Sequence, residues 1–338
     1  MTSLPPEFVR EAFVTGGTGF VGRSLVRHLL DRGWKVRVLA RNPSQASHLT
    51  ALGAEVVAGD LLDPVESLAS MMRGFGVVFH LAAWYQFGVR DEDLMARINV
   101  GGTERMVEAA TQAGVGRFVH CSTVGAHGAT GEAVCDEEHY DPQSVAALPY
   151  TRTKRAAHEV AQAAASAAMD VVLVSPTGIF GPGDKSMIGR LVGFAARGWM
   201  RVGFYRDTVM GFVHVDDVAQ GLRLAAEQGR SGRDYILVNK TASLGEVLAQ
   251  VCVSAGFAPP WFWLPAWAVW ASQPLGPLFA PFLGQGPYML RDAVAMMDGV
   301  SLRYDGIRAR QELGWEPGPF DHQLAATVMS FGSEGASD

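Results

Sequence analysis

The string TGGTGFVG at residues 15–22 constrains the fold of this chain more than any other feature of its sequence. The apolar run 11–14 predicts a strand before it, residues 24–30 after it have helical spacing, and residues 34–40 predict a second strand. Glycines allow a tight turn and let backbone N–H groups at a helix N-terminus approach a pyrophosphate. With 39 glycines in 338 residues the string alone is weak evidence. Between these flanks it predicts a dinucleotide-binding unit.

Strands and helices alternate through the first half of the sequence. Runs rich in β-branched and aromatic residues predict further strands at 56–60, 76–83, 117–123 and 171–174, separated by helices at about 64–72, 91–113 and 151–168. These runs are apolar without alternation, which is typical of strands covered on both faces. The predicted class is therefore α/β, a Rossmann fold with a doubly wound parallel sheet. Residues 212–219 predict a strand leading into a helix that rejoins this sheet.

Composition excludes several classes of protein. A net charge of −6, a pI near 5.9 and the absence of a basic run argue against nucleic-acid binding. Cys121, Cys135 and Cys252 are odd in number and lack CxxC spacing, which indicates free thiols in a reducing compartment, so we expect a cytoplasmic protein. Residues 1–7 do not resemble a signal peptide. The nine histidines are scattered without an HxxxH pair, which predicts no metal site.

A second string, YTRTK, places Tyr150 and Lys154 one turn apart on the same face of a predicted helix. A free phenol titrates near pH ~10, too high for an efficient base at neutral pH. The neighbouring ammonium would lower the phenol pKa, so the pair could move a proton at a carbonyl. The alternative is an exposed tyrosine and lysine on a helix surface.

Taken in order, these strings resemble the extended short-chain dehydrogenase/reductase superfamily (the NAD-dependent epimerase/dehydratase family), from Thr15 to about Phe320. Further matching strings are GDLLDP (59–64), HLAA (80–83), NVGGT (99–103), CSTVGAHG (121–128), SPTGIFGPGD (175–184), FVHVDDVA (212–219) and ELGWEP (312–317). The set is specific for the superfamily. It is poorly specific for the reaction, because reductases, hydroxysteroid dehydrogenases, nucleotide-sugar epimerases and dehydratases share it.

The resemblance implies a catalytic set. Tyr150 would be the general acid/base, and Lys154 would also hold the nicotinamide ribose. Thr123 falls where the family places its catalytic Ser/Thr, whose hydroxyl hydrogen-bonds the substrate oxygen; its neighbour Ser122 would face the opposite way. Asn99 falls where some members carry a catalytic Asn that orders a proton-relay water. The alternative for Asn99 is a polar helix residue that caps local backbone.

The resemblance also implies a set of residues around the dinucleotide. The acidic and leucine side chains after the third strand would contact adenine, two alanines would let the chain pass close to the cofactor, and a Pro-Thr pair would pass the nicotinamide amide. Simple packing is the alternative for the small residues. The set is Gly16, Gly19, Phe20, Val21, Gly22, Arg23, Arg41, Asp60, Leu61, Ala82, Ala83, Tyr150, Lys154, Pro176 and Thr177.

The end of the second predicted strand bears on the choice between NAD(H) and NADP(H). NAD enzymes usually place an acid there, which accepts a hydrogen bond from the ribose 2′-hydroxyl. Here Ala40 holds that position and Arg41 follows, which could pair with a 2′-phosphate, assisted by Arg23. We therefore expect a preference for NADP(H), with NAD(H) as the alternative; a solvated loop charge is the other interpretation of Arg41.

The residues before Phe212 separate two branches of the family. Many nucleotide-sugar epimerases carry a phosphate-binding Arg there, whereas this chain has Met210 and Gly211. With Arg41, this looks like the dihydroflavonol-reductase and 3β-hydroxysteroid-dehydrogenase side. We therefore expect an NADP(H)-dependent reductase or alcohol dehydrogenase for a hydrophobic or aromatic small molecule, whose pocket draws on Trp84, Thr123 and Phe180. The alternatives are an epimerase or dehydratase with bound NAD(P), and a non-catalytic NADP sensor.

Residues 247–290 contain no charged residue or histidine but four tryptophans. Three interpretations stay open: ordinary core of a substrate lobe, a hydrophobic lid, or a surface that touches membrane. Prolines leave no run long enough for a transmembrane helix. We expect a cofactor domain at 1–175 with about 209–240, a substrate lobe at about 176–208 and 241–330, and a flexible tail at 331–338. The sequence is compatible with a homodimer and does not name the substrate.

Overall fold

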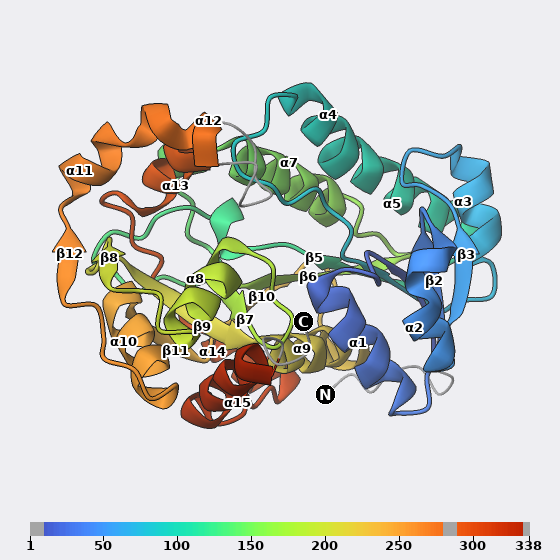
Figure 1. The fold of residues 1–338 in the computed structure, drawn as a ribbon. Helices are drawn as coiled ribbons and strands as arrows, with labels where there is room; N and C mark the ends of the chain where they lie inside the picture. Colours follow the sequence, from blue (N-terminus) through green and yellow to red (C-terminus); the bar gives the residue numbers. More distant parts are fainter. Residues whose placement is uncertain (1–9, 280–288, 334–338) are drawn as a thin grey trace.

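Seven parallel strands form the main sheet, in the order β10-β6-β5-β4-β1-β2-β3 (Figure 1). The computed structural model describes residues 10–279 and 289–333. The strands are β1 (Glu11–Thr15), β2 (Lys35–Ala40), β3 (Glu55–Ala58), β4 (Val77–His80), β5 (Arg117–Cys121), β6 (Asp170–Pro176) and β10 (Asp234–Leu237). The predicted doubly wound parallel sheet is confirmed, and every strand predicted in the first half of the chain is present.

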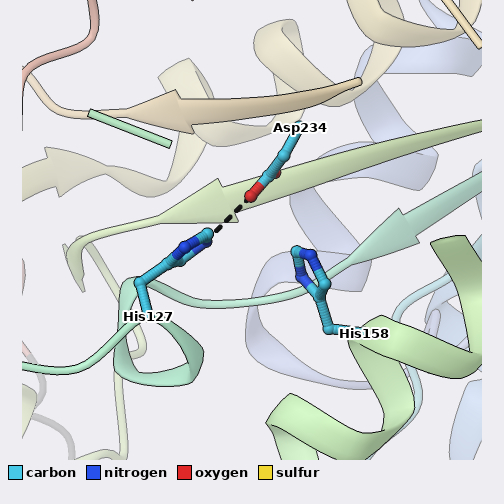
Figure 2. A group of neighbouring side chains, drawn as sticks. All are labelled: His127, His158 and Asp234. Atoms are coloured by element: carbon cyan, nitrogen blue, oxygen red, sulfur yellow. Dashed lines mark hydrogen bonds and ion pairs between the residues drawn. The ribbon is translucent and has the colours of Figure 1, made fainter. Parts of the chain in front are cut away.

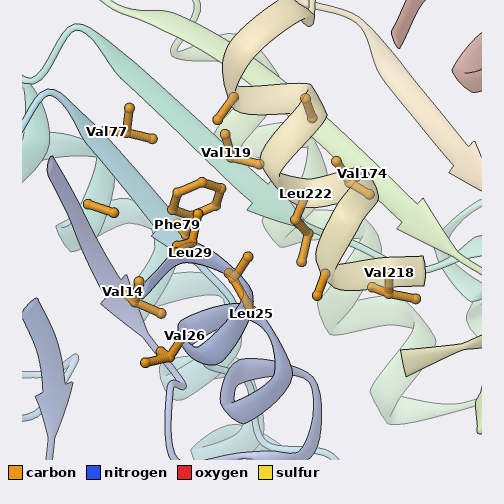
Figure 3. Packing of buried hydrophobic residues seen from close by; sticks show 14 of the residues in the cluster. Val14, Leu25, Val26, Leu29, Val77, Phe79, Val119, Val174, Val218 and Leu222 are labelled. Atoms are coloured by element: carbon orange, nitrogen blue, oxygen red, sulfur yellow. The ribbon is translucent and has the colours of Figure 1, made fainter. Parts of the chain in front are cut away.

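Helices cover both faces of the main sheet, as Figure 1 shows. One face carries α1 (Phe20–Leu30), α9 (Val215–Gln228), α2 (Ser47–Ala51) and α14 (Ile307–Leu313), and the other carries α3 (Val65–Met72), α5 (Gly102–Ala113) and α7 (Pro149–Ala163). The first layer is packed tightly: Phe79 and Val119 of the sheet meet Leu25 of α1 and Leu222 of α9, all fully buried (Figure 3). Side chains of this size contribute roughly 1.5–3 kcal/mol each when buried.

The segment predicted as one helix over 91–113 is interrupted. It consists of α4 (Glu92–Ala96), a π-helical turn η2 (Arg97–Gly101) and α5. Single π-helical turns inside helices are frequent at functional sites. Here the turn carries Asn99, one of the predicted site residues.

The strand predicted at residue 212 does not join the main sheet. β9 (Val209–His214) lies between β7 (Gly178–Phe180) and β11 (Lys240–Ser243) in a separate three-stranded sheet. The main ladder ends at Pro176, where the chain leaves the sheet to form β7. The following helix α9 does return, because it packs on α1, and β10, which no sequence argument singled out, is the seventh strand.

A smaller lobe follows Pro176 and has its own apolar core. Its helices are α8 (Met187–Ala196), α10 (Leu244–Ser254), α11 (Ala266–Ala271), α12 (Gly276–Phe279), α13 (Met289–Met297) and α15 (Phe320–Ser333), and β8 (Val202–Phe204) pairs with β12 (Phe262–Leu264). The core joins Phe212, Val247 and Leu324.

The first residues of the predicted flexible tail, 331–333, belong to a helix. Helix α15 continues to Ser333, and Phe331 is 7% exposed because it packs into the lobe core. Residues 334–338 of the predicted tail lie outside the described residues. Across the described part of the chain, no helix is long and apolar enough to cross a membrane.

Candidate active site

The carboxyl ends of four adjacent strands bring the predicted site residues to one edge of the sheet. Gly16 follows β1, Ala82 follows β4, Thr123 follows β5 and Thr177 follows β6. Parallel strands end at the same edge, which is where open α/β sheets bind ligands. Segments far apart in the sequence therefore meet where the resemblance expects a dinucleotide.

The glycine turn after β1 leaves no room for side chains. A Cβ at Gly16 (φ +72°) would lie 2.7 Å from the Ala82 nitrogen, and one at Gly22 would lie 2.1 Å from the Gly16 oxygen. Helix α1 starts at N-cap Gly19 with no side-chain cap and no acid in its first turn. Its first N–H groups and the positive end of its dipole are therefore available to an anion. This cradle fits a dinucleotide pyrophosphate.

The residues expected around the adenosine end of the dinucleotide differ in their exposure and contacts. Arg41 and Arg23 are both exposed, and among the described residues Arg41 makes no ion pair. Asp60 is half-buried and accepts a hydrogen bond from the Leu62 nitrogen. Leu61 points into the core, where it packs against Gly102 of α5. The side chain of Leu61 therefore packs rather than reaching toward adenine.

Tyr150 and Lys154 lie at the start of α7, under the end of β5. The Lys154 ammonium is buried and donates to the Cys121 carbonyl oxygen at 2.7 Å. The Tyr150 ring meets Tyr85 edge-on at 5.0 Å and Phe87 at 6.5 Å between centroids. Burial, followed by the neighbouring Tyr85 and Cys121, raises the pKa of the Tyr150 phenol well above its usual value. The phenol therefore keeps its proton at neutral pH and is a proton donor in this state. The expectation that Lys154 lowers this pKa is wrong for the protein without its ligands, because burial dominates and the Lys154 ammonium is bonded to the Cys121 carbonyl.

Ser122 and Thr123 point to opposite sides, as adjacent extended residues do. Ser122 is buried and its hydroxyl lies 3.0 Å from Nδ1 of His158. Thr123 is half-buried, and a Cβ at Gly125 would touch both Thr123 and Thr151, the residue after Tyr150. Ser122 is thus occupied by His158, whereas Thr123 lies on the other side of the strand end, near the first turn of α7.

Asn99 is fully occupied by protein partners. Its Oδ1 accepts from the Trp84 nitrogen at 2.7 Å, and its Nδ2 donates to Thr153 Oγ1 at 3.0 Å. The side chain therefore ties the π-helical turn to the loop after β4 and to α7. This arrangement is a positioning role, which is nearer to the local-capping interpretation than to a free side chain that orders water.

One of the two apolar residues predicted to line the substrate pocket, Phe180, lies in the lobe core instead. Trp84 is half-buried beside the site, but Phe180 is 2% exposed and packs against His214 and Phe320 in the lobe core. Sequence reasoning missed Tyr85 and Phe87, which cover the Tyr150 ring. Their signal was available, because they follow the β4 strand at the same edge of the sheet as Thr123.

Pro176 and Thr177 are buried, and the Thr177 hydroxyl donates to the Leu237 carbonyl at 3.1 Å. Met210, which stands where many epimerases carry an arginine, is buried in the lobe core. Arg201 and Arg206, the candidate replacements, lie on the β8–β12 edge of the lobe, where Arg206 stacks over Trp263 at 5.9 Å. These two arginines therefore do not replace the phosphate-binding arginine that many epimerases carry.

Three polar side chains that were not predicted to meet form a buried cluster behind Ser122. Figure 2 shows His127, His158 and Asp234. One ring nitrogen of each histidine and one carboxylate oxygen of Asp234 all lie within 4.8 Å of one another. His127 Nε2 is 2.8 Å from Asp234 Oδ2, and its Nδ1 is 3.3 Å from the His139 carbonyl oxygen. Both ring nitrogens of His127 thus face acceptors, which favours a charged imidazolium.

The charges of this cluster follow from the same contacts. Burial lowers the pKa of His127, but the hydrogen bond and charge of Asp234 outweigh it and raise that pKa overall. Burial raises the pKa of Asp234, but the hydrogen bonds from His127 and Ser175 and the charges of the two histidines together outweigh burial and lower that pKa to about 2. Burial lowers the pKa of His158 to about 4. An ion pair and a neutral histidine therefore account for the cluster without a metal, and the cluster adjoins a polar cavity of about 420 Å³.

The chain is similar in sequence and in fold to known proteins. The model of the "NAD dependent epimerase/dehydratase family" matches residues 12–239. A "putative dihydroflavonol 4-reductase" of Synechocystis is 35% identical over 96% of this chain and 95% of its own. A farnesyl-dihydroquinoline-oxide ketoreductase of Stigmatella aurantiaca is 32% identical over 94% and 95%. The structure of MoeE5 with UDP-glucuronic acid and NAD is 26% identical, with a TM-score of 0.73 over 96% and 99%.

Proposed function

The chain belongs to the NAD-dependent epimerase/dehydratase family, and from that premise we propose that it is an NADP(H)-dependent reductase of ketones or aldehydes on hydrophobic or aromatic small molecules. At the coarser level it is an NAD(P)-dependent oxidoreductase of the extended short-chain dehydrogenase/reductase type. The finer proposal rests mainly on one observation: the rings of Tyr85 and Phe87 contact the Tyr150 ring, and burial raises the pKa of its phenol. A protonated donor in apolar surroundings suits carbonyl reduction.

The reaction needs a hydride and a proton. A bound nicotinamide cofactor would supply the hydride to the carbonyl carbon. Tyr150 gives its phenolic proton to the carbonyl oxygen, and the Thr123 hydroxyl donates a hydrogen bond to that oxygen as negative charge develops on it. The Lys154 ammonium, one turn away on the same helix face, would stabilise the phenolate that remains once it turns from the Cys121 carbonyl oxygen. Asn99 holds the loop after β4 against α7 through Thr153.

The proposed cofactor is NADP(H). Ala40 ends β2 without a carboxylate, so nothing there would accept from a ribose 2′-hydroxyl. Arg41 is exposed and free of ion pairs among the described residues, and Arg23 lies just past the glycine turn. A guanidinium forms charge-assisted hydrogen bonds with a phosphate. The three cysteines are unpaired, which fits the proposed cytoplasmic location.

A nucleotide-sugar epimerase or dehydratase is the second candidate. The MoeE5 complex, which holds UDP-glucuronic acid and NAD, favours it. Against it stands Met210, which replaces the phosphate-binding cation expected there and is buried.

The deciding experiment is a comparison of substrates on purified protein. We expect NADPH to be oxidised with a panel of aromatic and long-chain ketones and aldehydes, and nucleotide sugars to bind weakly in calorimetry. Tight UDP- or GDP-sugar binding without turnover of any hydrophobic carbonyl would move the assignment to the epimerase.

A further inference from the structure

The lobe elements β8, β12 and α11 lie on the side of the molecule opposite β3 and α2 (Figure 1), and this part of the lobe carries exposed aromatic side chains. We define this aromatic surface by Trp199, Trp261, Phe262, Leu264, Trp267 and Trp270. Trp261 is 78% exposed, Trp267 72% and Trp199 68%. Single exposed apolar residues are ordinary, but contiguous exposed apolar patches mark sites of interaction.

The contacts bring the segments around Trp199, Trp261 and Phe262 together. The Trp261 nitrogen donates to the Arg201 carbonyl oxygen at 3.3 Å, so the segments that follow α8 and precede β12 lie side by side. β12 pairs in register with β8, which sets exposed Phe262 beside exposed Val202. One face of this two-stranded ribbon is therefore apolar and is not covered by the residues that the structure describes. Helix α11 follows directly after Pro265.

Helix α11 has an unusual composition for an exposed helix. Its sequence is AWAVWA, and none of its residues is buried. A helix that is apolar all round normally lies inside a protein or in contact with lipid. Since the described lobe does not cover it, packing within the chain accounts for only part of the uncharged stretch.

The chain segment around β8 is rich in cations. Arg197, Arg201 and Arg206 lie in it, and none of them makes an ion pair with the described residues. Arg197 stacks over Trp199 and Arg206 over Trp263, both at 5.9 Å. Asp207 is the one acid between residues 185 and 215. A local excess of cations on a chain of net charge −6 is complementary to an anionic partner.

We propose that the aromatic surface binds the interfacial region of an anionic lipid bilayer. Tryptophan rings favour the headgroup level of membranes, and guanidinium groups at the same level attract anionic lipids. A second copy fits less well, because an isologous interface would bring the same three arginines of both copies together. The interaction is peripheral. It is inferred from the surface alone and stands independently of the proposed reaction.

Vesicle binding tests this inference directly. The full-length protein is incubated with vesicles of phosphatidylcholine alone and with vesicles that also contain phosphatidylglycerol, and bound protein is measured by flotation. We expect flotation with the anionic vesicles, a blue shift of tryptophan emission, and weaker binding at high salt. Wild-type protein that stays with neither kind of vesicle would overturn the inference.

Variants separate the aromatic surface from general stickiness. The triple variant Trp261→Ser/Trp267→Ser/Trp270→Ser should bind anionic vesicles at least tenfold more weakly. The control Val134→Ser/Met329→Ser removes two side chains of similar exposure elsewhere, 66% and 69%, and should bind as wild type does. Unchanged NADPH binding and melting temperature would show that both variants are folded.

The arginines and self-association provide the remaining tests. Arg201→Gln/Arg206→Gln should reduce binding to anionic vesicles severalfold and leave the weak binding to phosphatidylcholine unchanged. Equal vesicle binding by the triple Trp variant and wild type would contradict the inference. So would a wild-type dimer in light scattering that the triple variant abolishes while vesicles bind neither protein, because the surface would then join two copies.

Discussion

The cofactor half and the lobe differ in where they place their largest apolar side chains. Among the described residues of the first half, Trp34, which follows α1, is buried, and Trp84 is half-buried beside the site. In the lobe, Trp199, Trp261 and Trp267 are among the most exposed residues of the chain. In the proposed function the first half holds a dinucleotide and a proton donor in fixed geometry, which requires close packing. The lobe is free to present apolar surface outward.

The largest expected effect tests the packing of the cofactor half. Phe79 is fully buried in β4 and meets Trp34 edge-on at 6.1 Å. Phe79→Ala should lower the free energy of unfolding by about 3–5 kcal/mol, because it removes buried surface and leaves a cavity. Urea denaturation measures the change. A loss below about 1 kcal/mol would mean that this half is not the tightly packed region.

Next comes the proton donor that this packing holds. Tyr150→Phe should reduce turnover at least a hundredfold, about 2.7 kcal/mol in the barrier, because only the acid is lost. NADPH binding should stay near the wild-type value. Tyr85→Phe, which removes the neighbouring phenol and keeps the ring, is the matched control and should retain most activity. A Tyr150 variant with more than a tenth of the wild-type rate contradicts the assignment.

Acid should destabilise the cofactor half through its buried histidines. Burial, followed by the charge of Lys154, lowers the pKa of His80 to about 3, and burial lowers that of His158 to about 4. The unfolded chain therefore binds more protons below its pKa of about 6.5, so stability falls as pH decreases from there toward the folded values. We expect a loss of about 2 kcal/mol per histidine between pH 6.5 and 5.

His127 acts in the opposite direction. Its raised pKa contributes stability that is fully present below pH ~6.5 and is lost as pH rises through its folded pKa. Urea denaturation at pH 7 and 5, with NMR titration of the imidazoles, checks both signs. Imidazoles of His80 and His158 that titrate near pH ~6.5 would show that these side chains are solvated.

A smaller effect is expected at the exposed rim of the cofactor site. Arg41→Ala should shift preference from NADPH toward NADH by about tenfold, since a charge-assisted pair to the 2′-phosphate is lost. The ratio of the two dissociation constants measures this preference. The interpretation of Arg41 is wrong if the wild-type protein binds NADH at least as tightly as NADPH.

The smallest effect belongs to the lobe. Trp270 is 63% exposed on α11, so Trp270→Ser should change the free energy of unfolding by no more than about 0.5 kcal/mol. Its counterpart in size, Trp34, is buried, and Trp34→Ser should cost several kcal/mol. Equal losses for the two substitutions would erase the contrast between the two regions.

Local patterns determined much of this protein in advance. The strands up to β6 and the longer helices between them were predicted from apolar runs and their spacing, because each depends on residues within about one turn or one strand. The glycine turn was predicted because its flanks are adjacent in sequence. Tyr150 and Lys154 were placed on one helix face by a spacing of four residues.

Tertiary contacts decided what no local pattern specifies. The side chains of Phe180 and Leu61 are buried in apolar cores, because residues more than 30 positions away in the sequence pack against them. The pairing of His127 with Asp234 spans 107 residues, and β9 joined a separate sheet because its partners are β7 and β11. Composition alone left the uncharged stretch 247–290 with three interpretations. Exposure depends on which elements cover a segment, and that is settled only when the whole chain is folded.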